Sequence, residues 1–182
     1  LVAIGASTGG PQAIESILKS LDHLSYIIII GIHMPAQHTT EFAKRMNDIS
    51  KLKVIEAQEG MPLSKGSVYI CPGGKHLQVI RQSNKLTCYL NQPIASDLHK
   101  PSIDILFQSI AKISGPETIG IIMTGMSNDG AQGLLEMKKK SSLTIVQDKK
   151  SCIVYGMPKA AKEINAAQIE LNIGQIIQLL KK

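Results

Sequence analysis

Residues 1–13 read LVAIGASTGGPQA, and this stretch decides how the rest of the chain is interpreted. The apolar run at residues 1–5 ends in glycine, which is typical of a buried strand. Apolar side chains then recur at the spacing of one helix face, at Ile14, Ile17, Leu18 and Leu21. The glycines and hydroxyls between the two runs therefore predict a sharp turn from a strand into a helix.

The rest of the chain repeats this alternation of strand and helix. The run YIIIIGIH at 26–33 is apolar at nearly every position, as a parallel strand covered on both faces must be. Further strands are expected at 53–57, 118–125, 143–147 and 169–173, and helices at 39–49, 100–113, 131–140, 158–164 and 174–182. The alternation predicts an α/β fold, with a doubly wound, mostly parallel sheet and helices on both of its faces.

The middle of the chain has a different pattern. The runs GSVYIC, LQVIR and KLTCYL are short and rich in β-forming residues, and the turn sequences PGGKH and QSN separate them. Short runs joined by such turns predict hairpins. We therefore expect these three runs to form an antiparallel patch, as an insertion or at an edge of the sheet.

Three polar residues stand where apolar strands end. Ser7 follows the first strand, His33 closes the second, and Asp129 follows the strand at 118–125. Because ligands bind beyond the carboxyl ends of the strands in an open parallel sheet, we expect the three side chains to share one edge. A hydroxyl, an imidazole and a carboxylate are the groups of an activated serine nucleophile.

Each of the three residues also has a purely structural interpretation. Ser7 is suited to capping the following helix, His33 to a hydrogen-bonded structural role, and Asp129 to a turn or a cap before Gly130. The combination favours the catalytic interpretation, because three independent turn residues have no need to be this triplet.

The stretch GASTG at 5–9 matches the G-x-S-x-G nucleophile elbow in a strand–turn–helix context. The chain order Ser7, His33, Asp129 nevertheless differs from the serine–acid–histidine order of α/β-hydrolases. A phosphate-binding loop is the alternative, since a helix N-terminus attracts anions. It has less support, because no GK[ST] follows and the glycine spacing does not fit G-x-G-x-x-G.

Composition bounds the class of protein. The chain has 182 residues, 43% of them apolar and 19% charged, and is expected to form one domain over 1–182. Only 3% are aromatic, which disfavours nucleic-acid binding by base stacking. Three widely spaced cysteines predict reduced thiols in a cytoplasmic protein. No apolar run is long enough to insert through a membrane.

Six blocks then occur in order along the chain: IGASTGGPQAI, HMPAQHTTEFAKRM, EAQEGMPLSKGSVYICPGGKHL, KPSIDILFQSIA, GIIMTGMSNDGAQGL and TIVQDKKSCIVYGMPKAA. Together they resemble the catalytic domain of bacterial chemotaxis protein-glutamate methylesterases, the CheB family, over essentially the whole chain. The resemblance implies a doubly wound parallel sheet with an antiparallel hairpin. It also implies hydrolysis of glutamate methyl esters on chemoreceptors, with deamidation of glutamines in many members.

The resemblance assigns roles to five residues. Ser7 in the GASTGG block corresponds to the catalytic serine, His33 in the HMP block to the histidine, and Asp129 in the GM-x-x-DG block to the aspartate. Thr8 and Met126 correspond to positions that line the site and help to stabilise the oxyanion. No metal or organic cofactor is implied.

The resemblance also implies partners. These are the methylated cytoplasmic helices of chemoreceptors, together with the receiver domain and histidine kinase of the chemotaxis pathway. Leu1 is not a natural start, so the chain is expected to be a segment of a longer protein, and a receiver domain would lie outside it. The formal charge of +6 would favour the acidic helices of a receptor.

Two stretches depart from the family pattern. This chain reads DLHKPS, which contains His99 and Lys100, where a GHRPS-like stretch is common, and KKKSSL where a small-residue turn is usual. We expect neither to touch the triad. A domain that keeps the fold without catalysis is the remaining alternative, and the intact triad positions disfavour it.

Overall fold

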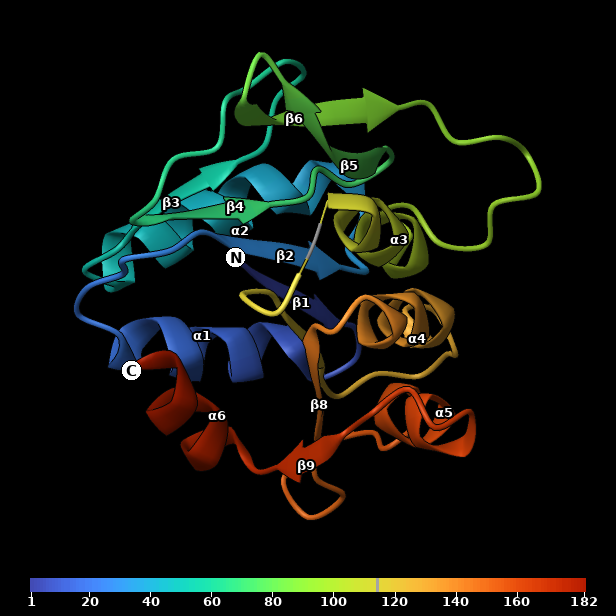
Figure 1. Ribbon diagram of the computed structural model, residues 1–182. Helices are drawn as coiled ribbons and strands as arrows, with labels where there is room; N and C mark the ends of the chain where they lie inside the picture. The colour runs from blue at the N-terminus through green and yellow to red at the C-terminus, as the bar shows by residue number, and fades with distance from the viewer. Residues whose placement is uncertain (114) are drawn as a thin grey trace.

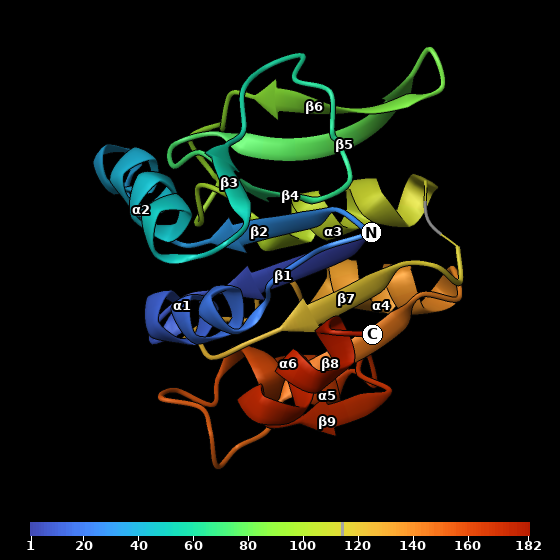
Figure 2. The same ribbon diagram turned by 90° about the vertical axis from the view of Figure 1, so that its left-hand side faces the viewer.

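The computed structural model describes residues 1–113 and 115–182. Within them a seven-stranded sheet has the order β3-β4-β2-β1-β7-β8-β9. All of its pairings are parallel, and Figure 2 shows β1, β2 and β7 pointing the same way. The strands are β1 (Val2–Ala6), β2 (Ile28–Ile32), β3 (Lys53–Glu56), β4 (Ser67–Ile70), β7 (Ile119–Ile122), β8 (Leu143–Gln147) and β9 (Ile169–Leu171).

Helices cover both faces of the sheet (Figure 1). One apolar core packs α1 (Gly10–Ser20), α2 (Ala36–Ile49) and α6 (Ile173–Leu180) against one face, and a second packs α3 (Ile103–Ile113), α4 (Ala131–Lys139) and α5 (Met157–Glu163) against the other. In β2, Ile28 and Ile30 belong to the first core and Ile29 to the second. This alternation explains the continuous isoleucine run and confirms the predicted doubly wound α/β fold.

One strand lies elsewhere than predicted. β5 (His76–Gln82) and β6 (Lys85–Asn91) form the expected antiparallel hairpin. The prediction that residues 66–71 join that patch is wrong, because β4 pairs in parallel with β2 and β3 in the main sheet. All four β4 residues are buried, which requires cover on both faces. A loop without a helix joins β3 to β4, so the helical signal that usually marks a parallel crossover is missing.

The strand order places the topological switch point beside β1. The chain first builds β2, β3 and β4 on one side of β1 and later returns to place β7 on the other side. Loops that leave β1 and β7 therefore diverge at the carboxyl edge of the sheet, where ligands bind in folds of this type. Ser7 and Asp129 are on these two loops.

No described helix is both long and apolar enough to cross a membrane.

Candidate active site

Ser7 and His33 leave the ends of two adjacent strands. β1 and β2 pair in register with Ala6 opposite Ile32, and the His33 N–H donates to the carbonyl of Ala6 at 3.1 Å. Neighbouring strands are about 4.8 Å apart, so the two residues begin side by side. Ser7 is partly buried, and 12% of the His33 side chain is exposed. The structure therefore brings these two predicted residues to one edge.

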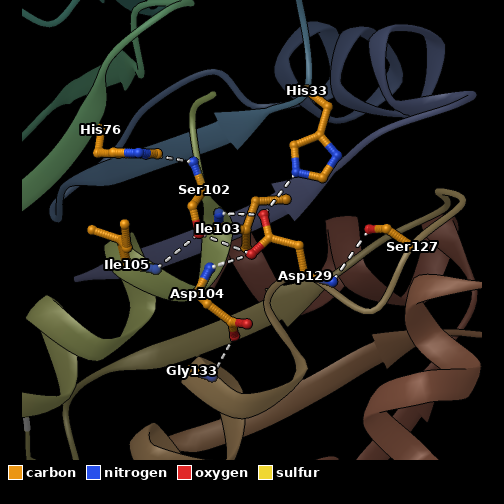
Figure 3. Close-up of polar contacts among 9 residues, drawn as sticks. All are labelled: His33, His76, Ser102, Ile103, Asp104, Ile105, Ser127, Asp129 and Gly133. Atoms are coloured by element: carbon orange, nitrogen blue, oxygen red, sulfur yellow. Dashed lines mark hydrogen bonds and ion pairs between the residues drawn. The ribbon is translucent and has the colours of Figure 1, made fainter. Parts of the chain in front are cut away.

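The Asp129 carboxylate joins His33 to the start of α3 (Figure 3). His33 Nε2 lies 2.8 Å from Asp129 Oδ2, and only 7% of Asp129 is exposed. The N–H groups of Ile103 and Asp104 donate to the same carboxylate at 2.6 and 3.0 Å, and Ser102 Oγ donates at 2.9 Å. The Asp129 carboxylate thus caps the N-terminus of α3, and a helix N-terminus favours a negative charge.

Three influences set the protonation state of Asp129. Burial raises its pKa, but hydrogen bonds from His33 and from the N–H groups of Ile103 and Asp104 outweigh burial and hold the pKa below its ordinary value. The carboxylate is therefore ionised at neutral pH. Because Nε2 of a neutral His33 donates to it, Nδ1 is the nitrogen left to accept a proton.

The Ser7 hydroxyl makes no hydrogen bond to any described residue. Gly9, not Ser7, is the N-cap of α1, and no side chain caps that helix. The structural interpretation of Ser7 as a helix cap is therefore wrong. Gly9 has φ of 81°, a left-handed conformation that glycine adopts without strain. The turn consequently leaves the hydroxyl unused by the fold.

A buried polar network under the serine turn was not anticipated from the sequence. The Thr124 carbonyl accepts from the Ser7 N–H at 3.0 Å, and Thr124 Oγ1 donates to the Thr8 carbonyl at 2.8 Å. The Thr124 N–H donates to Gln147 Oε1 at 2.9 Å, and Gln147 is fully buried. Thr124 thus ties the loop after β1 to the loop after β7. Its position directly after the apolar residues 121–123 is the only local signal.

Thr8 and Met126 lie on the loops that flank Ser7. Thr8 is exposed, and Met126 is 75% exposed although it is large and apolar. Neither backbone N–H donates to another group in the described part of the chain. Both N–H groups are therefore free to bind an oxygen atom of a ligand.

His99 corrects the expectation that DLHKPS stays clear of the candidate triad residues. Its imidazole stacks on His33 with ring centroids 4.1 Å apart and planes 7° from parallel. Burial lowers the pKa of His99, His33 lowers it further, and Asp129 acts in the opposite direction. The contact joins positions far apart in the chain, so no local pattern indicates it.

Close packing of side chains around Gly125 leads to a prediction for this residue. A Cβ at this position would lie 2.8 Å from the Ser7 Cβ and would also collide with Met157. We expect Gly125→Ala to displace Ser7 and lower kcat by about 100-fold, the cost of a misplacement of about 1 Å. Esterase kinetics and thermal unfolding would measure the effect.

Gly115→Ala is the matched control for that variant, because a Cβ there meets nothing within 4 Å. Wild-type kcat in Gly125→Ala would contradict the prediction.

In residues 1–113 and 115–182, no group of three or more His, Cys, Asp or Glu side chains is placed to hold a metal ion.

Comparison with known proteins identifies the family. The family model described as CheB methylesterase matches residues 2–180. The chain belongs to the CheB methylesterase family. The expectation drawn from the six sequence blocks is thereby confirmed.

Individual relatives agree with this family. A protein named protein-glutamate methylesterase/protein-glutamine glutaminase 2 from Hahella chejuensis is 43% identical over 178 residues, which are 98% of this chain and 48% of the relative. A similarly named protein from Pseudomonas savastanoi pv. phaseolicola is 44% identical over 183 residues, which are 99% of this chain and 50% of the relative. The chain thus spans about half the length of these relatives.

A solved structure supports the fold in the same way. The crystal structure of the Thermotoga maritima CheB methylesterase catalytic domain superposes with a TM-score of 0.94 at 34% sequence identity. The match covers 99% of this chain and 96% of that one. The CheB family fold is therefore present almost from end to end.

Proposed function

We propose that the chain hydrolyses glutamate methyl esters on chemoreceptors by a Ser7–His33–Asp129 triad. The observation that carries the proposal is the 2.8 Å contact between His33 Nε2 and Asp129 Oδ2, beside the strand end from which Ser7 emerges. Relatives named protein-glutamate methylesterase/protein-glutamine glutaminase support both the ester substrate and a second activity on glutamine amides.

The proposed reaction begins with transfer of the Ser7 hydroxyl proton to Nδ1 of His33 as Oγ bonds to the ester carbonyl carbon. Asp129 stabilises the imidazolium through Nε2, and need not take the proton itself. His33 then gives the proton to the methoxy oxygen, and methanol leaves. Water, activated by His33, splits the glutamyl–Ser7 ester and restores both the serine hydroxyl and a free glutamate.

Stabilisation of the oxyanion is assigned to the loops that flank Ser7. The N–H groups of Thr8 and Met126 have no protein acceptor among the described residues. One preorganised donor of this kind lowers a reaction barrier by about 3–4 kcal/mol. The exposed Met126 side chain would contact the substrate chain around the ester.

Methanol release tests the proposed function directly. The chain is incubated with a receptor cytoplasmic fragment that carries methylated glutamates, and methanol is measured, with ammonia measured from the glutamine form. We expect methanol release that follows saturation kinetics. A folded chain that releases no more methanol than buffer would contradict the proposal.

The proposed partners, cellular location and regulation follow from the same family role. The partners are the cytoplasmic helices of methylated chemoreceptors, so the enzyme acts in the cytoplasm. Residues 1–182 form one catalytic domain, which a receiver domain phosphorylated by the pathway's histidine kinase would regulate. Neither a metal nor an organic cofactor takes part in the proposed reaction.

Positive charge near the site predicts a salt-dependent reaction with receptors. Lys75 and Lys100 are exposed, and Lys100 follows the histidine that stacks on His33. Raising the ionic strength from about 0.01 M to about 1 M shortens the screening length from about 30 Å to about 3 Å. We expect kcat/KM on an acidic receptor fragment to fall about 10-fold or more, because steering is lost. A small neutral ester should be unaffected.

Charge reversal provides the matched control for this effect. Lys75→Glu with Lys100→Glu should weaken the salt dependence. Lys181→Glu with Lys182→Glu makes the same change in net charge at the chain end, which lies away from the carboxyl edge of the sheet (Figure 2), and should preserve it. Equal salt effects on receptor and neutral ester would contradict the steering interpretation.

A further inference from the structure

A second histidine covers the imidazole that the proposed mechanism uses. His99 and His33 stack face to face, with centroids 4.1 Å apart and an angle of 7° between the ring planes. One face of His33 is therefore closed, while its edge remains bonded to Asp129 through Nε2. His99 belongs to the β6–α3 loop, which we define as residues 92–102.

The β6–α3 loop is held in place by a contact between Asp97 and the buried His76. His76 is 2% exposed, and its Nε2 lies 2.9 Å from Asp97 Oδ2. The Ser102 N–H donates to His76 Nδ1 at 3.1 Å (Figure 3). Because Nδ1 accepts this hydrogen bond, the ring proton of a neutral His76 is on Nε2. That N–H donates a hydrogen bond to Asp97. The pair thus anchors the loop on both sides of His99.

Two backbone contacts complete the anchoring of this loop. The Ile94 N–H donates to Asp97 Oδ2 at 2.7 Å, and the Gly74 N–H donates to the Lys100 carbonyl at 3.1 Å. Hydrogen bonds from His76 and then from Ile94 lower the pKa of Asp97, so the anchoring carboxylate stays ionised. His99 is therefore presented to His33 from a fixed support.

The stacked ring limits how His33 can move. Rotation of the His33 ring out of its own plane, which would break the contact with Asp129, would drive the ring into the parallel His99 ring. His33 and Asp129 are the titratable groups that face His99, and Asp97 and Lys100 stand beside it on its own loop. A neutral ring in this place restrains His33 without adding a second positive charge beside the imidazolium.

We propose that His99 is a positioning residue for the reaction, pressed by the anchored β6–α3 loop against His33 so that the His33 ring stays aligned with Asp129. This inference rests on the proposed function for its kinetic consequences. The alignment itself exists in the free protein and can be measured without substrate.

Two substitutions of His99 separate ring stacking from other roles. His99→Ala removes the covering ring, and we expect kcat on a small glutamate methyl ester to fall by about 10- to 100-fold, since small misplacements of a catalytic group have effects of this size. KM should be unchanged, because the lost interaction acts in the transition state. His99→Phe restores a flat ring and should recover most of kcat.

The pH profile of kcat and the NMR signal of the His33 ring proton are two further measurements. Neither should change if His99 has a merely structural role. In His99→Phe the acid limb of kcat should lose the ionisation of His99, whose pKa burial holds below its ordinary value in wild type. The ring proton of His33 that binds Asp129 should give a protected NMR signal in wild type and in His99→Phe. The signal should be lost in His99→Ala.

His23→Ala is the matched histidine control, because His23 is exposed in the loop between α1 and β2. Wild-type kcat and an intact His33 signal in His99→Ala would overturn the proposal. Equal damage in His99→Phe and His99→Ala would also overturn it, since the ring face is restored in one of them. If wild type released no methanol, the proposed function would fail while the NMR signal still decided the alignment.

Discussion

Replacing Ser7 with alanine is expected to lower kcat for methanol release by about five to six orders of magnitude, as loss of a triad serine does in other enzymes. The physical reason is that the hydroxyl supplies the atom that attacks the ester. Its removal leaves no buried partner unsatisfied, because Ser7 Oγ makes no hydrogen bond to the described residues. Stability should therefore change by no more than about 0.5 kcal/mol.

A second serine on the following helix provides the control. Ser16 is exposed and its hydroxyl donates to the Gln12 carbonyl at 2.9 Å, so Ser16→Ala removes a hydroxyl that is bonded but remote from the site. Methanol release and urea unfolding are measured for both variants. A Ser7→Ala protein with wild-type activity would refute the nucleophile assignment, and a Ser7→Ala protein that unfolds would refute the claim that the hydroxyl is free.

Asp129→Asn is expected to lower kcat by about 10⁴-fold, because an amide no longer holds His33 in the tautomer that leaves Nδ1 unprotonated. Unlike Ser7, Asp129 also supports the fold through four donors: His33, Ser102, Ile103 and Asp104. Disturbing this buried acceptor should lower the free energy of unfolding by about 1–3 kcal/mol at neutral pH. Kinetics and urea unfolding together test both effects.

The stability effect of Asp129→Asn should depend on pH with a definite sign. The folded-state pKa of Asp129 is below its ordinary value, so the stabilisation is complete above the unfolded value of about 3.9 and is lost as pH falls through the folded value. The difference between wild type and variant should therefore shrink below about pH 4. A difference that stays constant between neutral and acid pH would contradict this assignment.

Asp104 offers a matched control of opposite sign. It is the second residue of α3, and it accepts from the Gly133 N–H of α4 at 2.6 Å. Burial raises its pKa, against the lowering effect of backbone hydrogen bonds. The folded state thus binds this proton more tightly than the unfolded chain, and the contribution of Asp104 to stability should grow as pH falls. Asp104→Asn should therefore remove a contribution to stability that grows as pH falls. Asp129→Asn removes a contribution that is lost as pH falls.

The candidate triad could be proposed from sequence because its members stand at the ends of apolar strands or on the loops that follow them. Parallel strands bring their carboxyl ends to one edge, so the sequence predicts that Ser7, His33 and Asp129 lie there. The local pattern of residues 5–9 did not choose between a serine turn and a phosphate loop. The other two strand ends, together with the family match, favour the serine turn.

Other parts of the site gave no usable local signal. Thr124 and Gln147 look like ordinary polar residues at strand ends, and only packing shows that they join three loops under Ser7. Residues 66–71 carry the same β-type composition as a hairpin strand, and burial on both faces made β4 a member of the main sheet. His99 looked like a family departure, although it contacts His33.

The sequence by itself determined the strands, the helices and the polar residues that follow three of the strands, because hydrophobic periodicity and turn chemistry act over a few neighbouring residues. Only the tertiary structure decided which nitrogen of His33 meets Asp129, which helix end that carboxylate caps, and which ring covers His33. The His33–Asp129 contact joins residues 96 positions apart. Contacts of this kind depend on strand order and on loops anchored elsewhere, which local patterns do not specify.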